Sequence, residues 1–246
     1  MKSFKIVCAA LLTALMLCAC QSPARELPPE ITTVPVMQSP SLKKAVESYV
    51  ATGREQTFTY TDKNDAEIAC VYRVPALRDD SDGAKAINAA ITAAYEDLFT
   101  QAQVAVNNNR EPEPISIRYD AYLNDDIVTL LITSEGQGHL LHCRAFNYNK
   151  TTREQLDNEG LLRYVQCDSD SAYADLKKAL TEDYMSKFKP EDFPDDYYYQ
   201  LELTVGDEAL REAQLFLNAD AALYAVCTEH ADVGSGAFEV LVAVGE

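Results

Sequence analysis

The sequence predicts an α+β fold, mainly an antiparallel meander of strands packed against two long helices. Residues 115–149 first alternate between apolar and polar side chains and then become continuously apolar, as consecutive strands of a sheet would. Residues 84–106 and the segment after Ser169 instead repeat apolar side chains every three or four positions, which is the period of a helix with one buried stripe.

Turn residues divide the meander into three strands. Asn-Asp-Asp at residues 124–126 predicts a turn, because short polar side chains hydrogen-bond to the local backbone. Residues 127–133 are apolar on both faces, which is typical of a central strand that is covered on both sides. Gly-Gln-Gly at residues 136–138 interrupts this strand, and the third strand is expected over residues 139–149. The other elements are expected to pack on this sheet.

A hairpin and a long helix are expected before the meander. Residues 56–61 and 66–74 have the pattern of two strands joined by a polar turn. Pro75 is expected to end the second strand, because proline has no backbone N–H to donate. Ser81 or Asp82 is expected to cap the helix that follows.

After the meander the chain is expected to form helices and then strands again. A short helix over residues 161–165 precedes the helix that Ser169 is expected to cap. Residues 188–199 are expected to form an irregular acidic and aromatic loop, and residues 201–205 a strand or part of that loop. The closing strands are expected at residues 213–218, 221–228 and 238–244.

The chain is strongly acidic, which limits the classes of partner that it can bind. The 246 residues carry a formal net charge of -18, and the residues after position 20 carry -20, because Lys2 and Lys5 are the charged residues before it. This charge excludes a nucleic-acid-binding surface, since phosphates would be repelled, and it disfavours charge-driven binding to anionic lipid. Solubility is the simplest role of the charge, and a basic partner is the sharper interpretation.

The N-terminus has the features of a bacterial lipoprotein signal. Lys2 and Lys5 precede an apolar run over residues 6–17, which is too short to span a bilayer comfortably. Leu-Cys-Ala-Cys at residues 17–20 then resembles a lipobox, with Cys20 as the acceptor of the lipid. A chance cysteine in a hydrophobic leader is the alternative.

Three regions follow from these signals. Residues 1–19 are expected to be the lipoprotein signal peptide, and residues 20–50 the lipid anchor with a proline-rich, semi-stiff tether. Residues 51–246 are expected to form the α+β domain, and a sub-division of that domain near residue 110 is an open alternative. The expected location is the cell membrane, facing the outside of the cell, with the lipid as the membrane contact.

Four cysteines lie outside the leader and the anchor: Cys70, Cys143, Cys167 and Cys227. An even number of cysteines in an exported domain predicts disulfides, whose connectivity the spacing does not decide. At least one disulfide is expected, and four buried free thiols are the alternative.

Candidate metal-binding and catalytic residues are few. His139 and His142 stand near Cys143, but side chains three positions apart in a strand face opposite sides, so no metal site is expected. Asp120 and Glu135 could pair as the carboxylates of a glycosidase, although a sequence does not give their separation. No catalytic constellation is identified, and neither enzymatic activity nor a cofactor is expected.

Short motifs in the meander and in the C-terminal strands resemble a known extracellular domain family. The motifs are Gly-Gln-Gly-His at residues 136–139, Phe-Asn-Tyr-Asn at 146–149, Phe-Leu-Asn-Ala-Asp-Ala-Ala-Leu-Tyr-Ala-Val at 216–226 and Gly-Ser-Gly at 234–236. This is the domain of the RsiV-type anti-sigma factors, which sense lysozyme, and of the non-catalytic N-terminal part of PdaC-type peptidoglycan deacetylases. The resemblance implies an RsiV-like extracellular domain, here as a stand-alone lipoprotein.

The expected function is therefore that of a membrane-anchored extracellular binding or sensing module. Residues 191–199 combine carboxylates with aromatic side chains, and tyrosine is favoured at interface anchors. The resemblance names lysozyme as the first candidate for a basic secreted partner. The alternatives are an enzyme that acts on cell-wall glycan or peptide, and an accessory domain that binds a wall component. The residues expected to bind the partner are Asp192, Asp195, Asp196, Tyr197 and Tyr198.

Lipid attachment at Cys20 is directly testable. Metabolic labelling of expressing cells with a fatty-acid probe is expected to mark the wild-type protein and to miss Cys20→Ser, because a diacylated cysteine supplies the two chains that stable anchoring needs. Equal labelling of the two proteins would contradict the lipoprotein signal.

Overall fold

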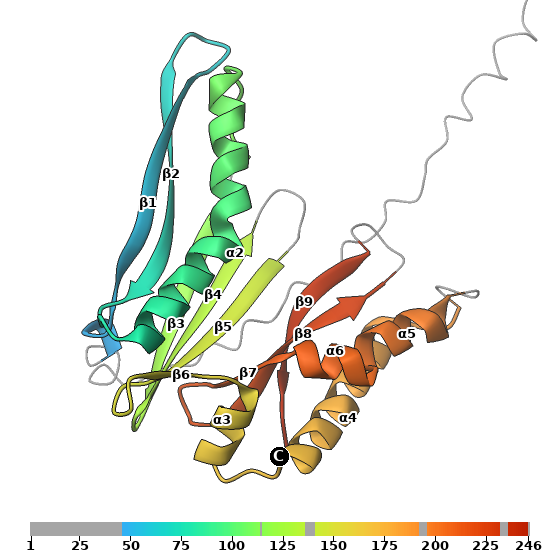
Figure 1. The fold of residues 1–246 in the computed structure, drawn as a ribbon. Coiled ribbons are helices and arrows are strands. Elements are labelled where there is room, and N and C mark those ends of the chain that lie inside the picture. Colours follow the sequence, from blue (N-terminus) through green and yellow to red (C-terminus); the bar gives the residue numbers. More distant parts are fainter. Residues whose placement is uncertain (1–45, 114, 136–140, 192–195, 232–235, 246) are drawn as a thin grey trace, which may run out of the picture. The chain divides into compact units, whose positions relative to one another are not determined.

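The computed structural model describes residues 46–113, 115–135, 141–191, 196–231 and 236–245. Over these residues the fold is α+β, as predicted: helices pack against antiparallel strands that form three sheets (Figure 1). Among them, no helix has the length and apolar character needed to cross a membrane. Cys20 and the expected signal peptide lie outside the described residues, so their assignment stays a prediction.

The strands form sheets in the orders β1-β2, β3-β4-β5-β6 and β7-β8-β9. The elements are β1 (Val50–Thr61), β2 (Glu67–Leu77), α2 (Asp82–Asn107), β3 (Ser116–Asn124), β4 (Ile127–Glu135), β5 (Leu141–Asn149), β6 (Glu154–Leu156), α3 (Asn158–Tyr164), α4 (Ser169–Lys187), α5 (Tyr197–Val205), α6 (Asp207–Glu212), β7 (Gln214–Leu217), β8 (Leu223–His230) and β9 (Ala237–Ala243).

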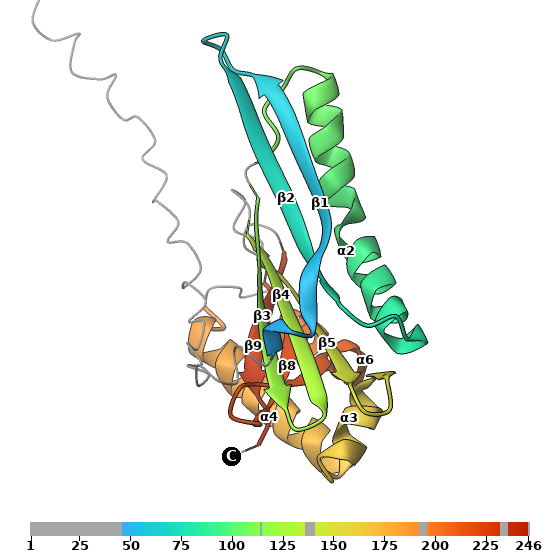
Figure 2. The same cartoon turned by 90° about the vertical axis from the view of Figure 1, so that its left-hand side faces the viewer.

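The predicted hairpin and helix are found as β1, β2 and α2, with the helix lying along the hairpin (Figure 2). Ser81 caps α2, because its side chain accepts a hydrogen bond from the Ala84 N–H at 3.2 Å. The rings of Phe58, Tyr72 and Phe99 hold the two layers together, with centroids 5.2 to 6.3 Å apart. The apolar stripe of the helix is therefore core, as its period predicts.

The predicted end of the second strand at Pro75 is wrong, since β2 continues to Leu77. Pro75 lies opposite Thr52, where the register of the hairpin shifts between Thr52 and Glu55. A two-stranded sheet consists of edge strands, and a proline beside a bulge leaves no ladder hydrogen bond unmade.

The packed core begins before residue 51, where the tether was expected to end. Val46 and Val50 are 3% and 4% exposed and belong to one hydrophobic cluster with residues of α2 and β4, such as Ile91 and Leu130. That cluster joins residues on both sides of position 110, so the described residues show no division there.

The three predicted strands of the meander are confirmed as β3, β4 and β5, which pair in register. A fourth strand, β6, lies where a polar turn was expected, and it pairs with the end of β5. Its three residues are too few to display the alternation from which longer strands are recognised.

Strand β4 is buried on both faces, as its continuous apolar sequence predicts. Val128, Leu130 and Ile132 join the cluster that contains α2 and the hairpin. Ile127 and Leu131, which point the other way, belong to clusters formed with the C-terminal half of the chain. Strand β4 therefore contributes side chains to a hydrophobic core on each of its faces.

The C-terminal helices differ from the prediction in two ways. Asp168, not Ser169, caps α4, since its carboxylate accepts from the Ser171 N–H at 3.0 Å. The strand or loop expected at residues 201–205 is wrong, because this stretch belongs to helix α5. The sequence Leu-Glu-Leu-Thr-Val alternates like a strand, but the buried residues Tyr197 and Thr204 are seven positions apart, which places them on one face of a helix and on opposite faces of a strand.

Hydrogen bonds between β5 and β7 link the meander to the last sheet. The Asn147 side-chain amide donates to the Leu215 carbonyl at 2.7 Å, and the Ala145 N–H donates to the Gln214 side chain at 2.8 Å. The closing strands β7, β8 and β9 are confirmed close to their expected positions.

Gly83, in the first turn of α2, marks a close approach of two backbones. A Cβ added there would lie 2.5 Å from the Arg153 carbonyl oxygen and 2.7 Å from the Gln155 nitrogen. Gly83→Ala is therefore expected to lower the free energy of unfolding by about 1–3 kcal/mol, although alanine normally favours a helix. Urea unfolding measures this change. The control Ala86→Gly, exposed on the same helix, is expected to cost about 1 kcal/mol, and a stabilising Gly83→Ala would contradict the close approach.

Candidate functional site

Three of the predicted partner-binding residues, Asp196, Tyr197 and Tyr198, lie at the start of α5. Asp192 and Asp195 are outside the described residues. Asp196 is exposed at the N-cap of α5, where, as far as the structure describes the chain, its side chain makes no capping hydrogen bond. Tyr197 is 4% exposed and points inward, whereas Tyr198 is 75% exposed. The two tyrosines that the sequence groups together therefore have different roles.

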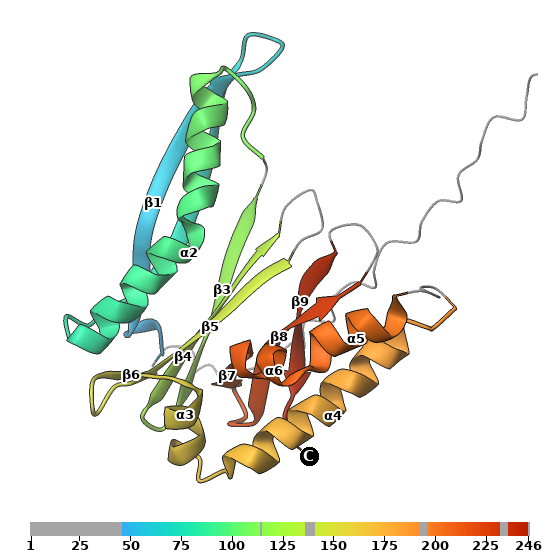
Figure 3. The same ribbon diagram turned by 45° about the vertical axis from the view of Figure 1, so that its right-hand side comes forward.

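A set of exposed apolar and aromatic side chains lies on the outer side of α5; we call Tyr198, Tyr199 and Leu203 the tyrosine face. Tyr199 is 62% and Leu203 is 37% exposed, and because they are four positions apart they share one side of the helix. The opposite side, which includes Tyr197 and Thr204, is buried against the protein. Figure 3 shows α5 beside α4, with β8 behind them.

Aromatic rings of α4 support the inner side of α5. The ring centroid of Tyr197 lies 5.7 Å from that of Tyr184, which lies 4.8 Å from that of Phe188. Tyr197 also meets Tyr198 edge-on at 5.3 Å. The exposed Tyr198 is thus connected to the interior of the protein through two buried rings.

Thr204 attaches the other end of α5 to β8. Its hydroxyl oxygen accepts a hydrogen bond from the His230 N–H at 2.9 Å and the hydroxyl donates to the Gln200 carbonyl at 2.9 Å. Thr204 is fully buried, so losing either bond would leave a polar group unsatisfied. The first and last turns of α5 are both held.

Beneath these contacts lies a group of charged side chains, Asp183, Lys187 and Glu229, which we call the buried charge cluster. The Lys187 ammonium is 2.9 Å from Oε2 of Glu229 and 2.5 Å from Oδ2 of Asp183. The side chain of Glu229 has no exposure at all, and that of Lys187 is 18% exposed. Burying a carboxylate costs free energy that one lysine offsets only in part.

Two polar atoms beside the cluster are unsatisfied. Within the described residues, neither Oε1 of Glu229 nor the hydroxyl of Tyr184 has a hydrogen-bond partner. Burial raises the pKa of the Glu229 carboxyl to about 7, against the Lys187 ammonium, which lowers it. Burial likewise raises the pKa of Tyr184 to about 12. Glu229 therefore exchanges its proton near neutral pH, while Tyr184 stays neutral.

The sequence interpretation missed the buried charge cluster, although one signal was present. In strand β8, which contains Cys227-Thr228-Glu229, alternation puts Glu229 on the same side as the buried Cys227. An acidic residue at an inward position predicts a buried carboxylate that needs a partner. No local signal identified Lys187, because it belongs to a helix distant in sequence.

The predicted disulfide is not formed, and the four cysteines outside the leader and anchor are free thiols. Cys70, Cys143 and Cys227 lie in three different sheets, each opposite a residue other than cysteine. Cys167 lies between α3 and α4. Burial raises the pKa of the Cys143 and Cys227 thiols to about 12, which keeps them in the protonated, unreactive form.

The two meander histidines are not brought into a described metal site. His139 lies outside the described residues, and His142 is exposed on β5 next to the buried Cys143. In the part of the chain that the structure describes, no three metal-ligating side chains come together.

The two candidate glycosidase carboxylates are far apart along the sheet. Asp120 lies opposite Leu131, and Glu135 lies opposite Ser116, on the neighbouring strands β3 and β4. Four residue steps of about 3.3 Å separate their positions by roughly 13 Å, which exceeds the separation of about 5–9.5 Å used by glycosidases. Glu135 instead forms an ion pair with Arg118 at 3.5 Å.

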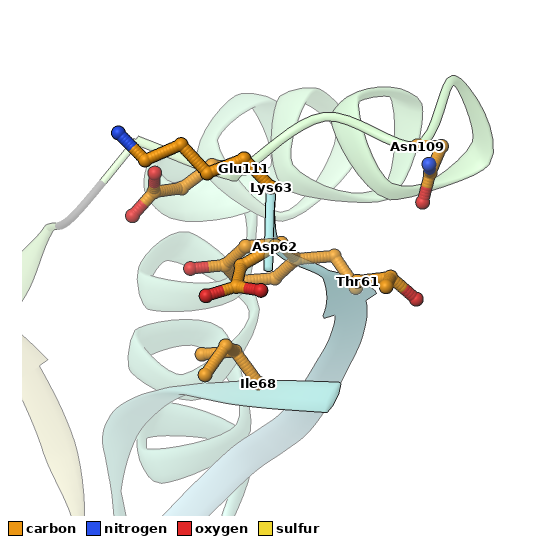
Figure 4. A pocket seen from close by; sticks show the side chains of 7 residues that line it. Thr61, Asp62, Lys63, Ile68, Asn109 and Glu111 are labelled. Carbon is orange, nitrogen blue, oxygen red and sulfur yellow. The ribbon is translucent and has the colours of Figure 1, made fainter. Parts of the chain in front are cut away.

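A hollow of about 420 Å³ lies at the tip of the β1–β2 hairpin and the end of α2 (Figure 4). Asp62 belongs to the hairpin turn, where its carboxylate accepts from the N–H groups of Ala66 and Asn64. These backbone hydrogen bonds lower the pKa of Asp62. Because this carboxylate already serves the turn, the hollow is a weaker candidate than the α5 region. Its lining residues are Tyr60, Thr61, Asp62, Lys63, Ile68, Asn109 and Glu111.

Comparisons with known proteins give a distant structural likeness. No family model and no curated protein matches the chain. A crystal structure of a member of the DUF3298 family from Bacteroides fragilis resembles it with a TM-score of 0.36 and 10% sequence identity, over 80% of this chain and 93% of that chain. A likeness at this level assigns no function, and the resemblance to the RsiV-type and PdaC-type domains stays a prediction.

The raised pKa of Glu229 predicts how stability depends on pH. The folded state holds this proton with a pKa of about 7 instead of the ordinary 4.5, so it binds the proton more tightly than the unfolded chain does. The resulting stabilisation is complete below the pKa of the unfolded state and is lost as the pH rises through the folded pKa. A shift of this size corresponds to about 3 kcal/mol.

Urea unfolding of the protein at a series of pH values tests this dependence. Glu229→Gln is expected to flatten the decline in the free energy of unfolding between about pH 4.5 and about pH 7, because the variant has no proton to lose. Glu182→Gln, an exposed change of equal charge on α4, is expected to keep the wild-type slope. Equal slopes in wild type and Glu229→Gln would refute the assignment.

Proposed function

We propose that this protein is a membrane-anchored extracellular binding module that engages a basic secreted protein, through the tyrosine face of α5. Lysozyme is the first candidate for that partner. The lipid on Cys20 holds the domain at the outside of the cell membrane, and the domain performs no chemistry on its partner.

The exposure of the tyrosine face is the observation that carries this proposal. Tyr198 and Tyr199 are 75% and 62% exposed on consecutive positions of one helix, although the interior offers large aromatic side chains a more favourable place. Tyrosine supplies a large contact area at a small cost in side-chain entropy, and it is enriched among residues that dominate binding energy. The rings beneath the face hold it in one orientation, which lowers the cost of ordering it on binding.

Charge supports a cationic partner. The chain has a formal net charge of -18, and a field of this sign accelerates encounter with a basic protein. Exposed carboxylates lie close to the tyrosine face in the sequence: Glu191, Asp196, Glu202 and Glu208.

The choice of lysozyme as the first candidate partner rests on different grounds. The motifs in the meander and the closing strands resemble a lysozyme-sensing domain, and that resemblance alone names the partner. Charge and exposed tyrosines would suit other basic proteins equally well, so the test must separate lysozyme from them.

Calorimetry of the mature chain with lysozyme tests the proposal. Replacing both Tyr198 and Tyr199 by alanine is expected to weaken binding by roughly thirtyfold or more, because an anchor residue contributes about 2 kcal/mol. Tyr119→Ala is the matched control, since this tyrosine is 48% exposed on β3, away from α5 in the sequence. It is expected to leave the affinity unchanged.

Salt separates specific binding from charge attraction. The wild-type heat is expected to persist at about 0.15 M ionic strength, where the Debye length is about 8 Å. Heat that disappears there, or equal affinity for any basic protein of similar size, would reduce the interaction to non-specific attraction. Turnover of wall glycan or peptide by the purified protein would instead favour the enzymatic alternative.

A further inference from the structure

We propose that the protonation state of the buried Glu229 controls how firmly α5 is held in place, and thereby how well the tyrosine face binds its partner. This inference rests on the proposed function for its second half. Its first half, the control of α5 by Glu229, does not depend on any partner.

The position of Glu229 is the first step. It projects from β8 without any exposed surface, opposite Phe238 of β9. One carboxylate oxygen faces Lys187, and the other has no hydrogen-bond partner among the described residues. An unsatisfied, fully buried oxygen is tolerated far better on a neutral carboxyl than on a carboxylate.

The charges around Glu229 give the second step. From α4, it faces Asp183 and Lys187, and the carboxylate of Asp183 adds to burial in raising the pKa of Glu229. With Glu229 protonated, the buried charge cluster holds one carboxylate and one ammonium and is balanced. With Glu229 ionised, the cluster carries two carboxylates against one ammonium; Asp183 is 36% exposed to water, but the charge on Glu229 is fully buried.

The tyrosine and cysteine groups near Glu229 stay neutral over the same range. Burial raises the pKa of Tyr184 on α4 and that of Cys227 on β8 to about 12, and it raises the pKa of Tyr197 on α5 above its usual value. Burial lowers the pKa of His230, the next residue of β8, whose side chain alternates to the other face of the strand.

The contacts of α5 connect this charge to the tyrosine face. The inner side of the helix rests on Tyr184 through Tyr197, and the hydroxyl of Thr204 bonds to the backbone N–H that follows Glu229 in β8. An ionised Glu229 gains solvation when water reaches its carboxylate, which has no exposure while these contacts are closed. Local opening of a short helix needs far less free energy than unfolding of the whole domain.

The expected consequence is that α5 opens more often at higher pH. If the pKa of Glu229 returns to its ordinary value when α5 opens, the opening equilibrium rises by roughly ten- to thirtyfold between about pH 5.5 and about pH 8. A partner that binds the closed form then loses affinity in proportion to the closed fraction.

Hydrogen exchange of the α5 backbone amides, measured on the mature chain without a partner and corrected for the intrinsic pH dependence of exchange, tests the first half. The opening equilibrium of residues 197–205 is expected to rise with pH in wild type and in the exposed control Glu182→Gln. It is expected to stay flat in Glu229→Gln. A flat wild-type profile, or a Glu229→Gln profile that still rises, would overturn the inference.

The wild-type titration keeps the test decisive even where Glu229→Gln does not fold. Carbon-13 NMR of the Glu229 carboxyl reports its titration directly, and the exchange of α5 must follow the same midpoint. A midpoint near that of an exposed glutamate, or α5 exchange that follows another midpoint, would overturn the inference.

Lysozyme calorimetry over the same pH range separates the two proposals. If the opening of α5 depends on pH but lysozyme binds at no pH, the proposed function is refuted and the control of α5 by Glu229 stands. Lysozyme binding with a pH-independent α5 refutes the control by Glu229 and leaves the proposed function.

Discussion

Burial of β4 on both faces is the constraint on which the rest of the structure depends. One face, with Val128, Leu130 and Ile132, needs α2 and the hairpin as cover, and the other, with Ile127 and Leu131, needs the C-terminal half. A strand without a polar face cannot border water, so neither half of the domain completes its core without the other. The sheet and its two covering layers therefore form by mutual burial.

Polar side chains give this burial its specific arrangement. The hydroxyl of Thr129, on the buried β4, donates to Asn147 at 2.9 Å, and Asn147 donates in turn to the Leu215 carbonyl at 2.7 Å. Glu239 of β9 accepts hydrogen bonds from the Cys143 N–H and the Arg144 guanidinium. Because a buried polar group without a partner is costly, these bonds select one position of the last sheet against β5.

The same last sheet supports α5, which carries the proposed binding surface. Its strand β8 presents Ala225 and Cys227 to the hydrophobic core and then Glu229 to α4 and α5. Ala225 and Cys227 on that face carry no charge near neutral pH, whereas Glu229 at its end brings a titratable carboxyl under α5. On the other side of that helix, Tyr198 and Tyr199 face the solvent. Rigid packing below and aromatic exposure above are what a binding surface needs.

The sequence by itself determined the elements whose periodicity is long and regular. The meander, the stripe of α2 and the closing strands follow from side-chain alternation or helical spacing, because burial of one face dictates those periods. It also determined that residues 191–199 are acidic and aromatic. Only the tertiary structure decided that Tyr197 is buried while Tyr198 is exposed, and that residues 201–205 are helical. Only it brought Lys187 to Glu229, since the 42 positions between them leave no periodic trace and the attraction of opposite charges acts through space.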